Sequence, residues 1–154
     1  MAIARGAGTE IIRTASFEDI VNNAASKNTL IMGEQHHIYT VLSVIIYCVS
    51  VASTKSTAYM HLIGYDANGC DSGQNIQILE QPMSATETFV WNDRFSFNGT
   101  EPTDSLTTPG IDSAADQDLI ADQATTTPQQ LVFYSAASSE TFDVSITYID
   151  QNNS

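Results

Sequence analysis

The stretch HHIYTVLSVIIYCVSV, residues 36–51, is the most apolar part of the chain and decides its fold class. A transmembrane helix needs about 20 consecutive apolar residues. This stretch is shorter, and the polar sequence ASTKST follows it. Most of its residues are β-branched or aromatic, and such side chains lose rotamer freedom in a helix but pack well on a pleated sheet. The stretch therefore predicts one long strand of a packed domain and argues against a membrane span.

Alternation along this strand places its side chains on two faces, both of them largely apolar. One predicted face carries Ile38, Leu42, Val44, Ile46 and Cys48, and the other carries Tyr39, Val41, Ile45, Tyr47 and Val49. Such a strand is either buried on both sides, or covers the core with one face and a neighbouring subunit with the other. The residues expected at that interface are His37, Tyr39, Val41 and Tyr47.

Other segments with strand patterns occur at regular intervals, at residues 28–33, 57–65, 75–81, 86–99, 129–136 and 141–150. We expect 37–51 and 57–65 to pair as a hairpin, and the last two segments to pair as a second hairpin. The Asn-Asp pair inside 86–99 predicts a bulge or a bend in that strand. Residues 66–74 are rich in Gly, Asp and Asn and predict a loop, and the strand at 75–81 is expected to stop at Pro82.

The sequence IDSAADQDLIADQ, residues 111–123, predicts one short helix, because Ser113 and Asp116 form a capping pattern. About seven to eight short strands with one helix are typical of an all-β protein, an antiparallel β-sandwich or jelly roll. The chain of 154 residues is expected to form a single domain at 14–154 after a Gly/Ala-rich N-terminal arm at 1–13. We expect this arm to lie across an adjacent subunit, with Arg5 and Arg13 paired to acidic groups of that neighbour.

The chain is strongly acidic, because 18 Asp and Glu residues against five Lys and Arg give a formal net charge of −13. So few cations cannot displace the counterions of a phosphate backbone, and we expect no nucleic-acid partner. Anionic membrane surfaces would repel the protein, and its charge is expected mainly to support solubility. The first twenty residues lack the apolar segment of a secretory signal peptide, which favours assembly in the cytoplasm.

No sequence pattern favours a catalytic, cofactor or metal site. The motifs of serine hydrolases, zinc proteases and phosphate-binding loops do not occur in the sequence. Adjacent residues such as His36 and His37 point to opposite faces of a strand, and the loop beginning at Asp66 lacks key positions of a calcium-binding loop. Cys48 and Cys70 are too few for a disulfide framework, while a single bond between them stays open. We expect a protein that is not an enzyme and that holds no cofactor or metal.

The segment FVWNDRFSFNG, residues 89–99, holds the only tryptophan beside a cation and supports two interpretations. Alternating aromatic side chains in a strand more often pack in the core, and we favour that interpretation. The alternative is a glycan-binding patch made of Trp91, Asn92 and Arg94, with an aromatic platform beside polar groups.

At four places the sequence reads MAIARGAGTEIIRTASFEDI, GEQHHIYTVLS, FVWNDRFSFNGTEP and ITYIDQNN. In these segments and in overall texture the chain resembles small virion structural proteins of tailed phages, especially phages of marine cyanobacteria. The resemblance covers most of the chain, and it brings no catalytic residues with it. It implies a β-rich component of the phage particle.

The function that this resemblance implies is that of a capsid decoration (cement) protein, which binds the capsid surface and self-associates. Its partner would be the major capsid protein or another virion protein, and a homo-oligomer is expected, with a trimer as one candidate. Its location would be the virion, after assembly in the host cytoplasm. The alternative is an accessory protein of the tail, neck or fibre, whose β-sandwich would bind a receptor or a glycan.

Overall fold

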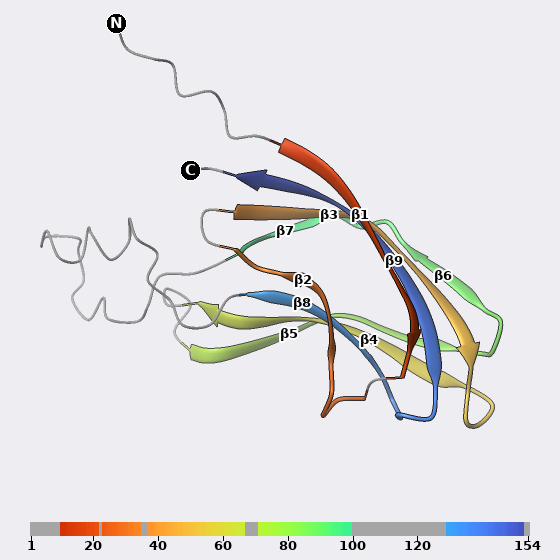
Figure 1. The fold of residues 1–154 in the computed structure, drawn as a ribbon. Helices are drawn as coiled ribbons and strands as arrows, with labels where there is room; N and C mark the ends of the chain where they lie inside the picture. The colour runs from red at the N-terminus through yellow and green to blue at the C-terminus, as the bar shows by residue number, and fades with distance from the viewer. Residues whose placement is uncertain (1–9, 22, 35–36, 67–70, 100–128, 153–154) are drawn as a thin grey trace, which may run out of the picture.

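The protein is an antiparallel β-sandwich of two sheets that pack face to face (Figure 1). A computed structural model describes residues 10–21, 23–34, 37–66, 71–99 and 129–152. Within these ranges the chain forms strands, turns and irregular segments and contains no helix. The all-β class predicted from the sequence is confirmed, and the helix expected at 111–123 lies outside the described residues.

Sheet A contains the longest strand, β3 (His37–Ser50), together with the first and last strands, β1 (Glu10–Ile20) and β9 (Thr141–Asn152). Its strand order is β1-β9-β3, and β6 (Thr88–Trp91) and β7 (Phe95–Asn98) pair one after the other along the far side of β3. The break between β6 and β7 falls at residues 92–94, where the Asn-Asp pair predicted a bend.

Sheet B contains the remaining four strands in the order β2-β8-β4-β5. Their bounds are β2 (Asn28–Met32), β8 (Gln130–Ser135), β4 (Ser56–Asp66) and β5 (Asp71–Met83). All their pairings are antiparallel. Sheet B therefore places β8, which precedes the last strand of the chain, between β2 and β4.

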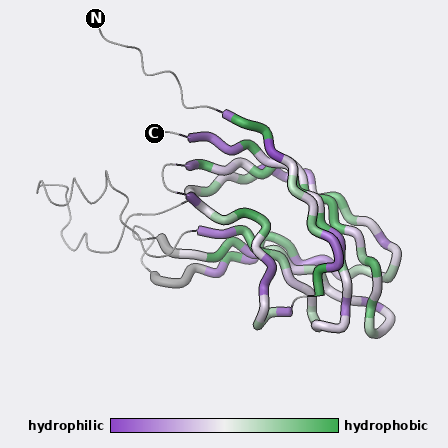
Figure 2. The backbone as a smooth tube through the Cα atoms, in the orientation of Figure 1, coloured by the Kyte–Doolittle hydropathy of each residue, from purple (hydrophilic) through white to green (hydrophobic). Residues whose placement is uncertain are grey.

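The core lies between the two sheets and is made of the apolar side chains on their inner faces. Figure 2 shows that hydrophobic residues occur along the strands of both sheets. Phe142 of sheet A and Phe133 of sheet B are fully buried, and their rings meet edge to face with centroids 5.6 Å apart. Other fully buried core side chains are Val41, Val44, Ile46, Cys48, Ala58, Met60, Met83, Leu131 and Ile146. Burial of these side chains supplies the main driving force for packing the sheets together.

Both predicted hairpins are wrong, because each pair of consecutive strands is divided between the sheets. β3 lies in sheet A and β4 in sheet B, while β8 lies in sheet B and β9 in sheet A. The connections at 51–55 and 136–140 therefore cross the gap of about 10 Å between packed sheets. β3 instead pairs with β9, with which it shares a long register from His37↔Asn152 to Ser50↔Thr141.

A β-bulge at Leu42 overturns the expected division of β3 into two faces. The register with β9 advances from Val41↔Tyr148 to Ser43↔Thr147, so Leu42 is an extra residue on β3. An inserted residue reverses the alternation beyond it. Tyr39 and Val41 before the bulge therefore share the inner face with Val44, Ile46 and Cys48 after it, and all five are buried.

Three strands, β1, β4 and β5, extend beyond their expected boundaries. β1 begins at Glu10, so residues 10–13 of the predicted arm belong to sheet A. β4 and β5 extend to Asp66 and from Asp71, which leaves a connection shorter than the predicted loop at 66–74. β5 also continues through Pro82 to Met83, and an edge strand tolerates proline where the missing N–H faces away from the sheet.

Three backbone segments meet at one end of the sandwich and link the two sheets. The Gly33 N–H donates to the Gln129 carbonyl at 2.9 Å, the Gln129 N–H to the Gly99 carbonyl at 3.0 Å, and the Gly99 N–H to the His37 carbonyl at 2.8 Å. A side chain at Gly33 would overlap the Gly99 carbonyl group. Glycine is required here because the backbones approach so closely.

Candidate functional site

A polar cluster around Asp150 lies where β3 begins and β9 ends, on the core side of sheet A. The Asp150 carboxylate accepts a hydrogen bond from Arg13 Nε at 2.8 Å, and its other oxygen lies 2.6 Å from His37 Nδ1. Asp150 is only 6% exposed, and His37 Nε2 lies 3.7 Å from the Glu34 carboxylate. One buried carboxylate thus connects β1, β9 and β3.

Two tyrosines complete this cluster. Tyr39 is buried, its hydroxyl accepts a hydrogen bond from the Glu34 N–H at 3.2 Å, and its ring lies 6.0 Å from the rings of both His37 and Tyr148. Burial, followed by the nearby Asp150 charge, raises the pKa of Tyr39 to about 12. Burial also raises the pKa of Tyr148, while the Arg13 charge acts in the opposite direction.

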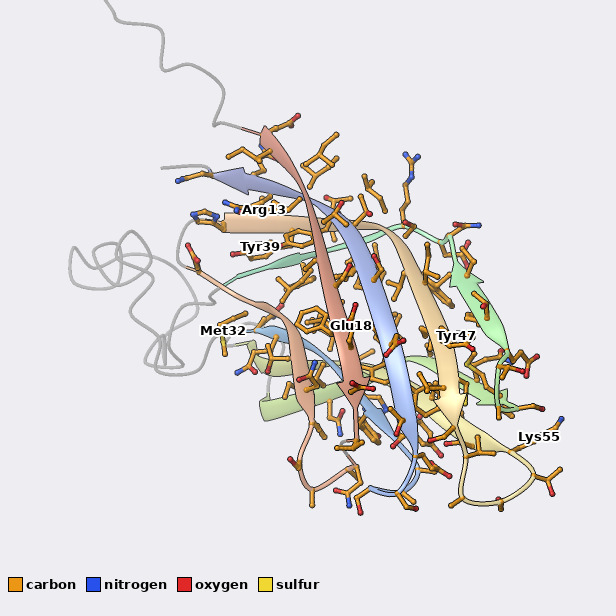
Figure 3. All side chains as sticks on the ribbon, turned by 45° about the vertical axis from the view of Figure 1, so that its right-hand side comes forward. Arg13, Glu18, Met32, Tyr39, Tyr47 and Lys55 are labelled. Atoms are coloured by element: carbon orange, nitrogen blue, oxygen red, sulfur yellow. The ribbon has the colours of Figure 1, made fainter. Side chains whose placement is uncertain are left out.

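Arg13 therefore has its acidic partner within its own chain. The hydrogen bond to Asp150 and the charge of that carboxylate raise the pKa of Arg13. Figure 3 shows Arg13 and Tyr39 at the end of sheet A where β3 begins. The expected N-terminal arm is corrected at Arg13, because this residue belongs to β1 of sheet A and pairs with Asp150 of its own chain. Arg5, the second expected arm residue, lies outside the described residues.

The residues expected at an interface along β3 are divided between its two faces. Tyr39 and Val41 are 3% and 0% exposed in the core, so they cannot contact a neighbour. His37 lies in the Asp150 cluster. Of the four, only Tyr47 lies on the outer face, where it is half-buried beside the exposed Ile45. The bulge at Leu42 is the physical reason for this correction.

The outer face of sheet A is the candidate interaction surface, and we call it the hydroxyl face. Hydroxyl side chains pair across its strands, Thr14 with Thr147, Ser16 with Ser145 and Thr40 with Ser96. Ile12 opposes Ile149 at one end, and Ile45 opposes Val90 toward the other. Ile12, Ile45 and Val90 are 70%, 44% and 47% exposed. Charged residues of its described strands stand at its ends: Glu10, Glu18 and Asp143.

A shallow hollow of about 190 Å³ lies in the hydroxyl face between β1, β9 and β3. Ile45 and Tyr47 form its apolar side, and Glu18 and Asp143 contribute carboxylates (Figure 3). Small-molecule sites usually measure about 300–1,000 Å³. The hollow is therefore suited to a single side chain of a partner protein more than to a free ligand.

Sheet B carries a second polar cluster, which the sequence analysis did not identify. His61 is 7% exposed, with Nδ1 2.6 Å from the Asn75 side-chain oxygen and Nε2 3.0 Å from the Tyr134 hydroxyl. Tyr59 stacks on Tyr134 at 5.0 Å, and the Lys27 ammonium lies 5.5 Å from the Tyr134 ring centre. Burial, then the nearby Tyr59 and Glu80, raises the pKa of Tyr134. Its hydrogen bonds link three strands through His61, Asn75 and Tyr134.

Trp91 packs partly against the core, which confirms the core-packing interpretation of its segment. It opposes Val44 on the inner side of sheet A, and its indole N–H donates to the Asp93 carbonyl at 2.8 Å. Asn92 and Arg94 are exposed in the irregular segment between β6 and β7. The three residues of the predicted glycan patch are adjacent, but the indole that would serve as its platform is packed inward.

Two absences hold for the residues that the structure describes. No group of three or more His, Cys, Asp or Glu residues is close enough to hold a metal ion in that part of the chain. No helix long and apolar enough to cross a membrane occurs there either. Cys48 is a buried free thiol, and burial raises its pKa, with Glu140 and Glu87 adding to the effect.

Comparisons with known proteins add no relative. No protein-family model matches the chain, and no curated protein is found to be similar to it. The functional argument therefore depends on the two polar clusters, on the hydroxyl face and on the sequence itself.

Proposed function

We propose that this protein is a structural component of a tailed-phage virion, a decoration (cement) protein that binds the capsid surface and self-associates. Its partner is the major capsid protein or another virion protein, and it reaches the particle after assembly in the host cytoplasm. The resemblance of the sequence to small virion proteins supports this proposal, and so does the β-sandwich architecture.

The hydroxyl face is the observation that carries the proposal. In a chain with a net charge of −13, most of one sheet surface is uncharged and displays Ile12, Ile45 and Val90. Exposed apolar side chains grouped among neutral polar ones are typical of protein–protein contacts, in which the buried centre is depleted of charge. Tyr47 and the hollow beside it supply an anchor point of the kind that dominates binding energy in such contacts.

The Asp150 cluster supports the same function through rigidity. It ties the edge strand β1 to β9 and β3 through Arg13 and His37, so the hydroxyl face is a preformed surface. Association with a rigid surface costs less conformational entropy than association with one that must first order. Each of the many copies bound to a regular capsid lattice would bind at this lower cost in conformational entropy.

The proposal is tested by locating the protein in the intact particle and by altering its surface. Cryo-electron imaging of particles with and without the protein is expected to show its density on the capsid exterior. Its absence from purified particles, or density confined to the tail or neck, would overturn the assignment to the capsid.

A pair of double variants tests the binding surface. Ile45→Gln with Val90→Gln removes two exposed apolar side chains from the hydroxyl face, and Met32→Gln with Ile76→Gln removes two of similar exposure from sheet B. The first pair is expected to weaken binding to capsids that lack this protein by about tenfold or more, and the second by less than about twofold. Equal effects of the two pairs would exclude the hydroxyl face as the binding surface.

A further inference from the structure

The two sheets have four edges, and these edges are not equally protected. Sheet A ends at β1 on one side and at β6 and β7 on the other, while sheet B ends at β2 and β5. An edge strand presents unpaired N–H and C=O groups, and natural proteins usually blunt such edges against pairing with another chain.

Three of the four edges carry features that hinder pairing. β2 is only five residues long, and its register shifts between Thr29 and Ile31. β5 contains Pro82, and its register with β4 shifts twice. The third edge is divided into β6 and β7, with four residues each. Short strands, proline and bulges are the recognised devices of this kind.

The fourth edge, β1, lacks these features over most of its length. From Glu10 to Phe17 its register with β9 is unbroken, and the segment contains neither proline nor lysine. Its irregularity comes only afterwards, between Phe17 and Ile20, where Asp19 has a φ of 53°. No described strand pairs with the other side of β1. Ile11 and Ile12 are 45% and 70% exposed at its beginning.

We infer that the free edge of β1 pairs in antiparallel orientation with β1 of a second copy, which joins the two A sheets into one continuous sheet. Such a contact is isologous, because the same segment is used by both copies about a two-fold axis. Main-chain hydrogen bonds supply its specificity for an extended strand. The inference specifies the self-association part of the proposed function and does not require the capsid.

The order of side chains along β1 favours a second copy in antiparallel orientation. Thr14, Ala15 and Ser16 form an uncharged centre, Arg13 precedes it, and Glu18 and Asp19 follow it. Antiparallel pairing about that centre brings the end of each strand that holds Arg13 alongside the end of the other strand that holds Glu18 and Asp19, whereas parallel pairing would place equal charges side by side. It also covers the beginning of the strand, where Ile11 and Ile12 are exposed.

Sedimentation velocity over a range of protein concentrations, at physiological ionic strength, tests this inference. Screening at that ionic strength limits the repulsion between two copies that each carry −13. A reversible monomer–dimer equilibrium is expected. A protein that stays monomeric at the highest concentration, or that forms a trimer without a dimer, would overturn the two-fold pairing.

Lysine variants locate the contact. Ile12→Lys places a charge on the edge strand and should raise the dimer dissociation constant by about tenfold or more, although it makes the net charge less negative. Met32→Lys on sheet B and Ile45→Lys at the centre of the hydroxyl face make the same charge change and should alter it by less than about twofold. A dimer that survives Ile12→Lys, or that Ile45→Lys disrupts equally, would contradict edge pairing.

Hydrogen exchange on the unaltered protein gives a second readout. Amides of β1 should exchange more slowly in the dimer than in the monomer, while those of the opposite edge, β6 and β7, should not change. Unchanged exchange in β1 on dimerisation would overturn the inference. If the dimer forms as expected but the protein does not bind capsids, the edge pairing stands and the proposed capsid function fails.

Discussion

Sheets A and B bury their inner faces with similar apolar side chains, but they stabilise their strand registers with different chemistry. Sheet A uses a charged cluster, in which Asp150 contacts Arg13 and His37. Sheet B uses a hydrogen-bonded cluster without a carboxylate, in which His61 contacts Asn75 and Tyr134. The Arg13 side chain is 49% exposed, and His61 is 7% exposed. The charged cluster thus occurs where one of its members, Arg13, stays exposed to water, because burying a charge without a compensating partner is costly.

The largest expected effect tests whether the two sheets depend equally on their shared core. Phe142→Ala in sheet A and Phe133→Ala in sheet B should each lower the free energy of unfolding by about 3–5 kcal/mol. Because their rings are in contact, the double variant should lose less than the sum of the two single losses. Urea unfolding measures all three. Strictly additive losses would show that the sheets do not share one core at this point.

A smaller effect is expected from neutralising the charged cluster of sheet A. Asp150→Asn weakens the charge-assisted hydrogen bonds to Arg13 and His37 and should cost about 1.5–3 kcal/mol of unfolding free energy. The loss should shrink as salt is added, since screening weakens the native contact. Asp93→Asn removes an exposed carboxylate between β6 and β7; it is the control and should change stability by less than about 0.5 kcal/mol. Equal effects at both positions would refute the structural role of Asp150.

The second cluster, in sheet B, should respond more weakly and with little salt dependence, because the hydrogen bond between Tyr134 and His61 involves no carboxylate. Tyr134→Phe removes the hydrogen bond to His61 and should cost about 0.5–1.5 kcal/mol. Tyr59→Phe is the matched control, because its ring stacks on Tyr134 and no hydrogen bond of its hydroxyl is found among the described residues. Thermal or urea unfolding at low and high salt compares the two. A loss for Tyr134→Phe that depends on salt would show that a charge contributes to the hydrogen bond between Tyr134 and His61.

The last effect is zero at neutral pH and appears only in alkali. The pKa of Tyr39 is raised from 10.0 to about 12 by burial, so between these values the unfolded chain releases a proton that the folded protein retains. The unfolded state binds fewer protons there, and stability therefore falls as the pH rises from 10 to 12. Tyr39→Phe should flatten this part of the stability curve. Tyrosinate absorbance and unfolding midpoints measure it, and an unchanged curve in Tyr39→Phe would contradict the raised pKa.

Local patterns in the sequence predicted the long strand β3 and the break between β6 and β7, because both features depend on side-chain type over a few residues. β3 was expected at 37–51 and spans His37–Ser50, and the Asn-Asp pair marks the gap between β6 and β7. The bulge at Leu42 could not be predicted, since leucine suits a regular strand as well as a bulge. It nevertheless decides which apolar residues of β3 are available to a partner.

Pairings between distant residues were also beyond sequence reasoning. Arg13 and Asp150 lie 137 positions apart, and His61 and Tyr134 lie 73 apart. Nothing near either residue indicates its partner. Consecutive strands were expected to form hairpins, but a connection of a few residues serves equally well for crossing between sheets. The connections cross between the sheets because β3 pairs with β9 along almost the whole length of both strands.

The contact among Gly33, Gly99 and Gln129 has a practical consequence. Gly99 and Gln129 are far apart in the sequence, yet they are hydrogen-bonded to each other. A designed linker that joined these two residues would have to close only this short distance, and lengthening such a loop costs little extra free energy. The pair is therefore a defined attachment point at which a designed insertion could be fixed to both sheets.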